Sequence, residues 1–191
     1  NNQLIGAHHP LLLVAGGLDT SPSPDDAAAW NDLDFLSGLY QAGANTILPV
    51  VGLRLSAVEG LPSAHPGKTG SNVLRHYENV RKLMTENGHT SGVIWITYLG
   101  FTPGTSELDQ TEWLSEAYPQ IRAQLYIGAA FLQGANTCQQ DWAECHEVSL
   151  LSPSSQPHPF TPVLRGILSQ GYHPPEVIRG REKSSALRKS R

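Results

Sequence analysis

A tyrosine lies near the end of an apolar segment, where α/β enzymes often carry a reactive group. Residues 92–101, with the sequence GVIWITYLGF, are mostly apolar and include Tyr98 near their C-terminal end. Such a run predicts a buried strand followed by a glycine-containing loop. A phenol with a pKa of about 10 is only about 0.1% ionised at neutral pH, so Tyr98 needs a nearby base to act as a nucleophile. The pattern supplies no such base, and we interpret Tyr98 as a packing aromatic at a strand end.

Two acids lie beside predicted strands and offer carboxylate chemistry. Asp19 follows the apolar run 11–18, and Glu107 lies in the loop after Tyr98. Carboxylates act as general acids, general bases or nucleophiles when a fold brings them to a substrate. An acid in a surface loop is usually only solvated, and we interpret both residues in this way.

The two cysteines of the chain, Cys138 and Cys145, lie close together in one predicted loop. A disulfide between them would stabilise the fold by about 2 to 3 kcal/mol through loop closure. The even count and the close spacing favour a disulfide, and hence an extracytoplasmic location, over two free thiols. His146 is adjacent, but the paired spacings of zinc motifs are missing, so we expect no metal.

Glycine-rich segments do not match nucleotide-binding motifs. A dinucleotide fold needs G-x-G-x-x-G at its first strand-to-helix turn, and residues 15–19 (AGGLD) do not supply it. Gly67, Lys68 and Thr69 resemble the end of a phosphate-binding loop, but Pro62 stands where that motif requires glycine. We therefore expect no cofactor.

Composition gives an ordinary globular chain of 191 residues with a formal net charge of −4 and a pI near 6.0. This balance predicts no nucleic-acid binding. No apolar run approaches the roughly 18 residues that span a bilayer, although association with a membrane complex stays open. We predict one domain over residues 1–175 and a solvated basic tail over 176–191, whose charged residues from Ile178 onward are Arg179, Arg181, Glu182, Lys183, Arg188, Lys189 and Arg191.

Hydrophobic patterning places these residues on alternating strands and helices. Apolar runs predict strands at 11–18, 46–55, 93–99 and 127–132. Helical spacing predicts helices at 31–44, 72–87, 108–125 and 163–170, with Pro119 expected to bend or break the third of them. This alternation indicates an α/β fold with right-handed parallel crossovers, as an open doubly wound sheet or as part of a (β/α)8 barrel.

Taken in order, the segments resemble the C-terminal half of a (β/α)8-barrel retaining glycoside hydrolase of the clan that includes cellulases and xylosidases. Residues 9–18 are similar to the fifth strand, and residues 31–36 with 39–44 to the following helix. The sixth helix and the seventh strand are matched by residues 80–88 and 94–97. The closing segment is matched by residues 148–151, Pro157, Pro159 and residues 162–165. The resemblance implies a half-barrel of the triosephosphate isomerase type.

The resemblance also locates the catalytic groups, and this chain departs from them. Retaining hydrolysis needs two carboxyl groups about 5 to 5.5 Å apart, an acid/base and a nucleophile. In the family the seventh strand ends Trp-Ile-Thr-Glu-Phe-Gly-Trp with the Glu as nucleophile, whereas this chain has Tyr98. The acid/base lies on the fourth strand, which the matched segments do not include.

Two further positions depart from the family. The sixth strand of the family commonly ends Gly-Val-His-Pro-Tyr, where this chain has Gly-Leu-Arg-Leu with Arg54. The eighth strand usually carries a sugar-platform Trp, where this chain has Leu132 and Gln133. Trp95 precedes its strand end, so we expect it in the core. Together, Tyr98, Trp95, Arg54 and Gln133 predict a vestigial site rather than a catalytic one.

A half-barrel leaves two strand edges and one sheet face uncovered, which is an aggregation liability. We therefore expect either an N-terminal half of the same polypeptide or another protein to cover the sheet. The leading hypothesis is a catalytically inactive module that serves as a structural or accessory subunit of a larger extracytoplasmic assembly. The alternatives are an active retaining glycosidase with a relocated nucleophile and a missing N-terminal half, and a pseudoenzyme that binds carbohydrate.

Overall fold

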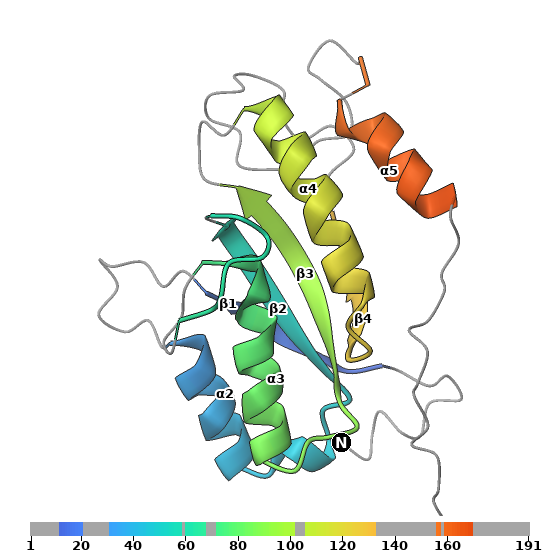
Figure 1. Ribbon diagram of the computed structural model, residues 1–191. Coiled ribbons are helices and arrows are strands. Elements are labelled where there is room, and N and C mark those ends of the chain that lie inside the picture. Colours follow the sequence, from blue (N-terminus) through green and yellow to red (C-terminus); the bar gives the residue numbers. More distant parts are fainter. Residues whose placement is uncertain are drawn as a thin grey trace, which may run out of the picture.

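Four parallel strands form one sheet whose spatial order follows the order of the sequence (Figure 1). The computed structural model describes residues 12–20, 31–58, 60–67, 72–101, 106–132, 156–157 and 159–169. The strands are β1 (Val14–Asp19), β2 (Val50–Val58), β3 (Val93–Phe101) and β4 (Ile127–Ala130). The helices are α2 (Asp32–Gln41), α3 (Tyr77–Glu86), α4 (Glu107–Arg122) and α5 (Phe160–Ser169).

This topology confirms the predicted α/β class. Each neighbouring pair of strands is parallel, and one helix connects each strand to the next. A doubly wound sheet reverses its strand order at a switch point, whereas here the order β1-β2-β3-β4 never reverses. The open sheet therefore fits a partial α/β barrel.

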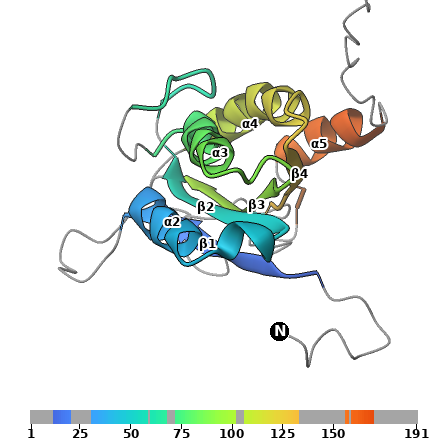
Figure 2. The same cartoon turned by 90° about the horizontal axis from the view of Figure 1, so that it is seen from below.

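All four helices pack against the same face of the sheet, as Figure 2 shows from below. Alternate residues of the two central strands, such as Leu53 and Ile96, point to this face and are fully buried. They meet one core residue or more from every helix, among them Leu36, Val80, Leu114 and Phe160. We call this side the helix-covered face, and the opposite side, over which no described helix lies, the open face.

Strand boundaries differ from the predicted ones where local backbone chemistry overrides hydrophobicity. Leu12 and Leu13 are exposed, so β1 begins only at Val14. Residues 44–46 form a short 3-10 turn after Gly43, whose φ of 84° ends the preceding helix, so β2 starts at Val50. At their C-terminal ends, β2 and β3 extend to Val58 and Phe101, beyond the predicted ends at 55 and 99.

Helix α4 passes through Pro119 without breaking, so of the predicted bend or break the break does not occur. Proline removes one backbone donor, but the helix continues to Arg122, and the Ala123 amide donates to the Pro119 carbonyl at 3.0 Å. Helix α2 ends at Gln41, three residues early, and a 3-10 turn (Leu74–His76) precedes α3. Strand β4 stops at Ala130, and α5 starts three residues early at the buried Phe160.

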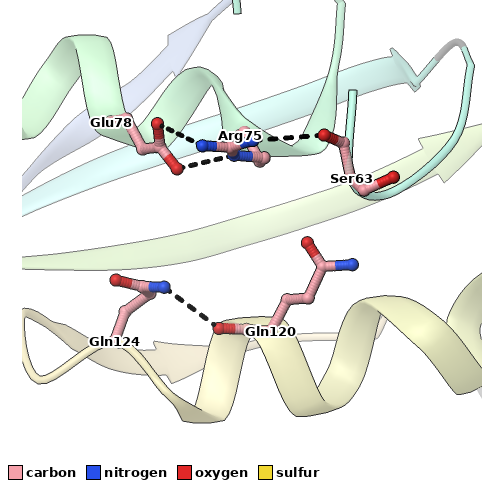
Figure 3. A network of polar contacts seen from close by, with 5 residues as sticks. All are labelled: Ser63, Arg75, Glu78, Gln120 and Gln124. Carbon is pink, nitrogen blue, oxygen red and sulfur yellow. Dashed lines mark hydrogen bonds and ion pairs between the residues drawn. The ribbon is translucent and has the colours of Figure 1, made fainter. Parts of the chain in front are cut away.

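The loop after β2 is attached to α3 through Arg75. Its guanidinium forms a bidentate pair with Glu78, at 2.7 and 3.0 Å, and donates to the Ser63 carbonyl at 3.1 Å (Figure 3). At the end of α4, the Gln124 side chain donates to the Gln120 carbonyl at 3.4 Å. These contacts lie on the helix side of the sheet and fix elements around the core.

Two buried histidines connect elements on the helix-covered face of the sheet. The His76 Nε2 donates to the Asp32 carboxylate at 2.6 Å, and both side chains are almost fully buried. The Tyr40 hydroxyl lies 2.9 Å from His89 Nδ1, and His89 also bonds the backbone of Leu48. Burial is the main cause that lowers the pKa of His89, so the ring is held neutral and Nδ1 accepts from Tyr40.

No helix in the described ranges is long and apolar enough to cross a bilayer. The predicted domain boundary at residue 175 and the basic tail 176–191 lie outside the described residues.

Candidate functional site

A β-bulge in β3 determines which of its side chains reach the open face. Leu53 pairs with Ile96 and Arg54 with Tyr98, so Thr97 is one extra residue on β3. The Thr97 hydroxyl donates to the Leu53 carbonyl at 3.2 Å. A bulge re-aims the side chains beside it and is common next to functional sites. Here Tyr98 is buried, at 7% exposed, yet it lies outside the helix-side core and turns to the open face.

Arg54 connects three neighbouring strands near their C-terminal ends. Its guanidinium carbon lies 3.9 Å above the centre of the Tyr98 ring on β3. Its Nε lies 3.2 Å from Asp19 Oδ2 on β1, and the two side chains are 42% and 41% exposed. A cation over an aromatic face is attracted by the ring quadrupole, and the carboxylate fixes the guanidinium from the side. We call Asp19, Arg54 and Tyr98 the strand-end cluster.

Trp95 forms an aromatic pair at the other side of the open face. Its ring centre lies 5.8 Å from that of Phe131, which is 47% exposed. A Cβ built on Gly128 of β4 would lie 2.8 Å from the Trp95 Nε1, so only glycine leaves room for the indole. Trp95 is half-buried and does not belong to the core. The expectation that it packs in the core is therefore wrong.

Glycines bring β1 close to the second strand. A Cβ on Gly52 would lie 1.9 Å from the Gly16 carbonyl oxygen, a backbone atom that cannot move aside. Gly16 has a φ of 34° and sits where the β1–β2 register shifts by one residue. A Cβ on Gly17 would lie 3.5 Å from the Arg54 Cβ and 3.3 Å from the Thr97 hydroxyl. This second bulge, in β1, places Asp19 opposite Arg54.

The structure brings together part of the predicted vestigial site. Arg54 and Tyr98 are in contact, and Trp95 lies opposite Gly52, two residues before Arg54 along β2. Gln133 lies outside the described residues, as do Cys138, Cys145 and His146. Leu132 packs against the helix-side core.

The two candidate acids behave differently from each other. Asp19 is ion-paired with Arg54, so it is not simply a solvated acid. Glu107 begins α4 rather than lying in a loop.

The pairing of Asp19 with Arg54 and the exposure of Phe131 depend on strand register, for which the sequence carries no direct signal.

The open face is poor in carboxylates. Among the four described strands Asp19 is the one acidic residue, and the remaining described acids lie on α2, α3 and α4. No group of three or more His, Cys, Asp or Glu in the described ranges could hold a metal ion. The described part of the site therefore offers one ion-paired carboxylate, one guanidinium and three aromatic rings.

Comparison with known proteins supports the fold. No protein-family model and no curated protein sequence matches the chain. Among solved structures, the chain is similar to a family 39 glycoside hydrolase from the gut symbiont Bacteroides cellulosilyticus WH2, with a TM-score of 0.50 and 15% sequence identity. The similarity covers 66% of this chain and 28% of the hydrolase, so the chain spans about a quarter of that protein's length. At this identity the likeness concerns the fold alone, and it agrees with a glycoside-hydrolase-like partial barrel.

Proposed function

We propose that this chain is a catalytically inactive glycoside-hydrolase-like module that serves as a structural or accessory subunit of a larger extracytoplasmic assembly. One observation carries the proposal. Tyr98, which resemblance puts at the nucleophile position, is covered by the guanidinium of Arg54, and the acid on the described strands is already ion-paired with that guanidinium.

Glycoside hydrolysis of the retaining type requires two carboxyl groups on opposite sides of the scissile bond. The strand-end cluster contributes one carboxylate, Asp19, whose Oδ2 faces Arg54 at 3.2 Å. Tyr98 is 7% exposed, so an attacking phenol oxygen would have little access to an anomeric carbon. This arrangement favours the loss of chemistry over a relocated nucleophile.

The accessory role is supported by the open face, over which no described helix lies. The edge strands of the sheet are β1 and β4, and residues on the open face, including Gly17, Arg54 and Gly128, remain exposed. Uncovered parallel sheets are rare because both faces are normally buried. A partner that covers the open face would remove this liability.

Hydrolysis of 4-nitrophenyl β-xyloside and β-glucoside by the purified chain tests the inactivity. We expect nitrophenol release equal to the buffer blank for the wild type, Tyr98→Phe and Asp19→Asn alike. Release by the wild type that Tyr98→Phe or Asp19→Asn abolishes would overturn the proposal. When material from native cells is separated by size-exclusion chromatography, we expect the 20.7 kDa chain to elute in a larger complex. Elution as a free monomer would contradict the accessory role.

Carbohydrate binding without hydrolysis is the second candidate function. The Trp95 and Phe131 pair favours it, because exposed aromatic rings can stack on the apolar faces of sugars. Calorimetric titration with xylo- and cello-oligosaccharides separates the two candidates. Heat that Trp95→Ala removes would support sugar binding, and the absence of heat with these glycans would leave the accessory role.

A further inference from the structure

Arg54 is held in one orientation by two neighbours on adjacent strands. Asp19 contacts its Nε edge, and the Tyr98 ring lies against its plane. A guanidinium carries five N–H donors in a rigid fork, so contact at Nε leaves the edge formed by Nη1 and Nη2. Neither terminal nitrogen hydrogen-bonds to another described residue, and the side chain is 42% exposed.

A guanidinium that is contacted from two sides, on a side chain that is 42% exposed, is suited to bidentate binding of a carboxylate through its terminal nitrogens. Asp19 offsets the charge of Arg54, so the pair attracts distant anions only weakly. Recognition would then depend on short-range hydrogen bonds rather than on long-range steering. Arg54 is the one cationic residue on the described strands, so no other residue of these strands competes for the same anion.

We propose that Arg54 anchors a side-chain carboxylate from the partner polypeptide that covers the open face. This inference rests on the proposed accessory function and specifies the chemistry of its partner. Arg, Trp, Tyr and Phe are the residue types enriched at the cores of protein–protein interfaces, and the open face carries one of each in Arg54, Trp95, Tyr98 and Phe131. An acidic residue next to an apolar one on the partner would complement this surface.

A peptide titration of the full 191-residue chain tests the proposal. The probes are acetyl-Phe-Glu-Leu-amide and its Phe-Gln-Leu counterpart, followed by NMR through the Arg54 Nε–H and the Trp95 indole N–H. We expect the Glu peptide to bind at least about tenfold more tightly than the Gln peptide, as for one charge-assisted bidentate pair. Arg54→Gln should abolish this preference. Arg54→Lys should lose most of it, because an ammonium cannot form the bidentate pair.

Arg165→Gln on α5 is the matched control, because it removes an exposed arginine from the helix side and should keep the preference. Equal binding of the two peptides, or a preference that survives in Arg54→Gln, would overturn the proposal. D-glucuronate binding more tightly than the Glu peptide, with D-glucose as its neutral control, would assign the carboxylate to a sugar and overturn the polypeptide carrier. The hydrolysis assay is independent of these results, so an inactive chain without a Glu preference refutes this inference alone.

Discussion

Two aspartates on opposite sides of the sheet each pair with a basic side chain, and their surroundings differ. On the helix-covered side, Asp32 and His76 are 2.6 Å apart and almost fully buried. On the open side, Asp19 and Arg54 are 3.2 Å apart and about two-fifths exposed. A buried pair is costly to break, whereas an exposed pair contributes little to stability. The first pair therefore supports the fold more strongly than the second.

The residues around each pair follow the same division. The helix-covered face is built from branched aliphatic residues such as Val51, Leu53 and Ile94. A complete barrel fills its interior with similar branched side chains. The open face instead carries glycines, including Gly17 and Gly52, beside Arg54 and the aromatic rings. This composition differs from the branched aliphatic side chains that fill the interior of a complete barrel.

Removal of Asp32 should have the largest effect on stability. Asp32→Ala leaves His76 buried without its acceptor, so we expect a loss of about 3 kcal/mol in the free energy of unfolding. Asp34→Ala is the matched control, because Asp34 lies in the same first helical turn but is exposed. Urea denaturation measures both. Equal effects of the two substitutions would show that the buried pair has no special role.

A methyl group between β1 and β2 should have the next largest effect. Gly52→Ala places a Cβ against the Gly16 carbonyl, and we expect a loss of about 2 kcal/mol from the forced backbone shift. Gly38→Ala in α2 meets no atom within 4 Å and should instead stabilise the fold by about 0.5 to 1 kcal/mol. Thermal unfolding of both variants measures the contrast. A neutral Gly52→Ala would mean that β1 does not approach β2 so closely.

Acid should weaken the helix-covered side through His89. Burial lowers its pKa below the unfolded value of about 6.5, so its neutral form is favoured in the fold. The stabilisation is fully present above about pH 6.5 and is lost as the pH falls through the lower folded pKa. We therefore expect the unfolding free energy to drop more between pH 7 and pH 5 in the wild type than in His89→Gln. Identical pH profiles for the two proteins would contradict this prediction.

At alkaline pH, ionisation of the Tyr40 hydroxyl should destabilise the fold. Burial raises its pKa to about 12, so the stabilisation is present below about pH 10 and is lost as the pH rises towards 12. Tyr40→Phe should flatten this alkaline loss. Spectrophotometric titration of the wild type and the variant at 295 nm, with unfolding measured in parallel, gives the comparison.

The exposed pair should have the smallest effect on stability. Asp19→Asn and Arg54→Gln each remove a partly exposed ion pair, and we expect losses below about 1 kcal/mol. Urea denaturation under the conditions used for Asp32→Ala makes the values comparable. A loss near that of Asp32→Ala would place the strand-end cluster among the supports of the fold and remove the contrast between the two faces.

Much of the architecture was accessible from the sequence because continuous apolar runs mark strands buried in a parallel sheet. The run 93–99 predicted most of β3, and Gly88 correctly marked the end of α3. The break allowed for at Pro119 does not occur, because a helix packed on a core can lose one hydrogen bond and continue.

The site was less accessible, because its contacts depend on register. The resemblance singles out Tyr98 and Arg54, but their stacking requires the bulge at Thr97. Asp19 reaches Arg54 only because the β1 backbone shifts at Gly16. A shift of one residue changes which side chains share a face. Gly16 and Gly17 are compatible with the shift in β1, but no residue type marks the shift at Thr97.

The proposed inactive module should form no covalent glycosyl intermediate. Incubation of the full chain with activated 2-deoxy-2-fluoro glycosides, followed by intact-mass measurement, tests this expectation most directly, because such compounds trap the covalent intermediate of a retaining enzyme. We predict an unchanged mass for the wild type, Tyr98→Phe and Asp19→Asn. A mass increase by one fluoroglycosyl group, mapped to Tyr98, Asp19 or another residue of the chain, would contradict the proposed inactivity.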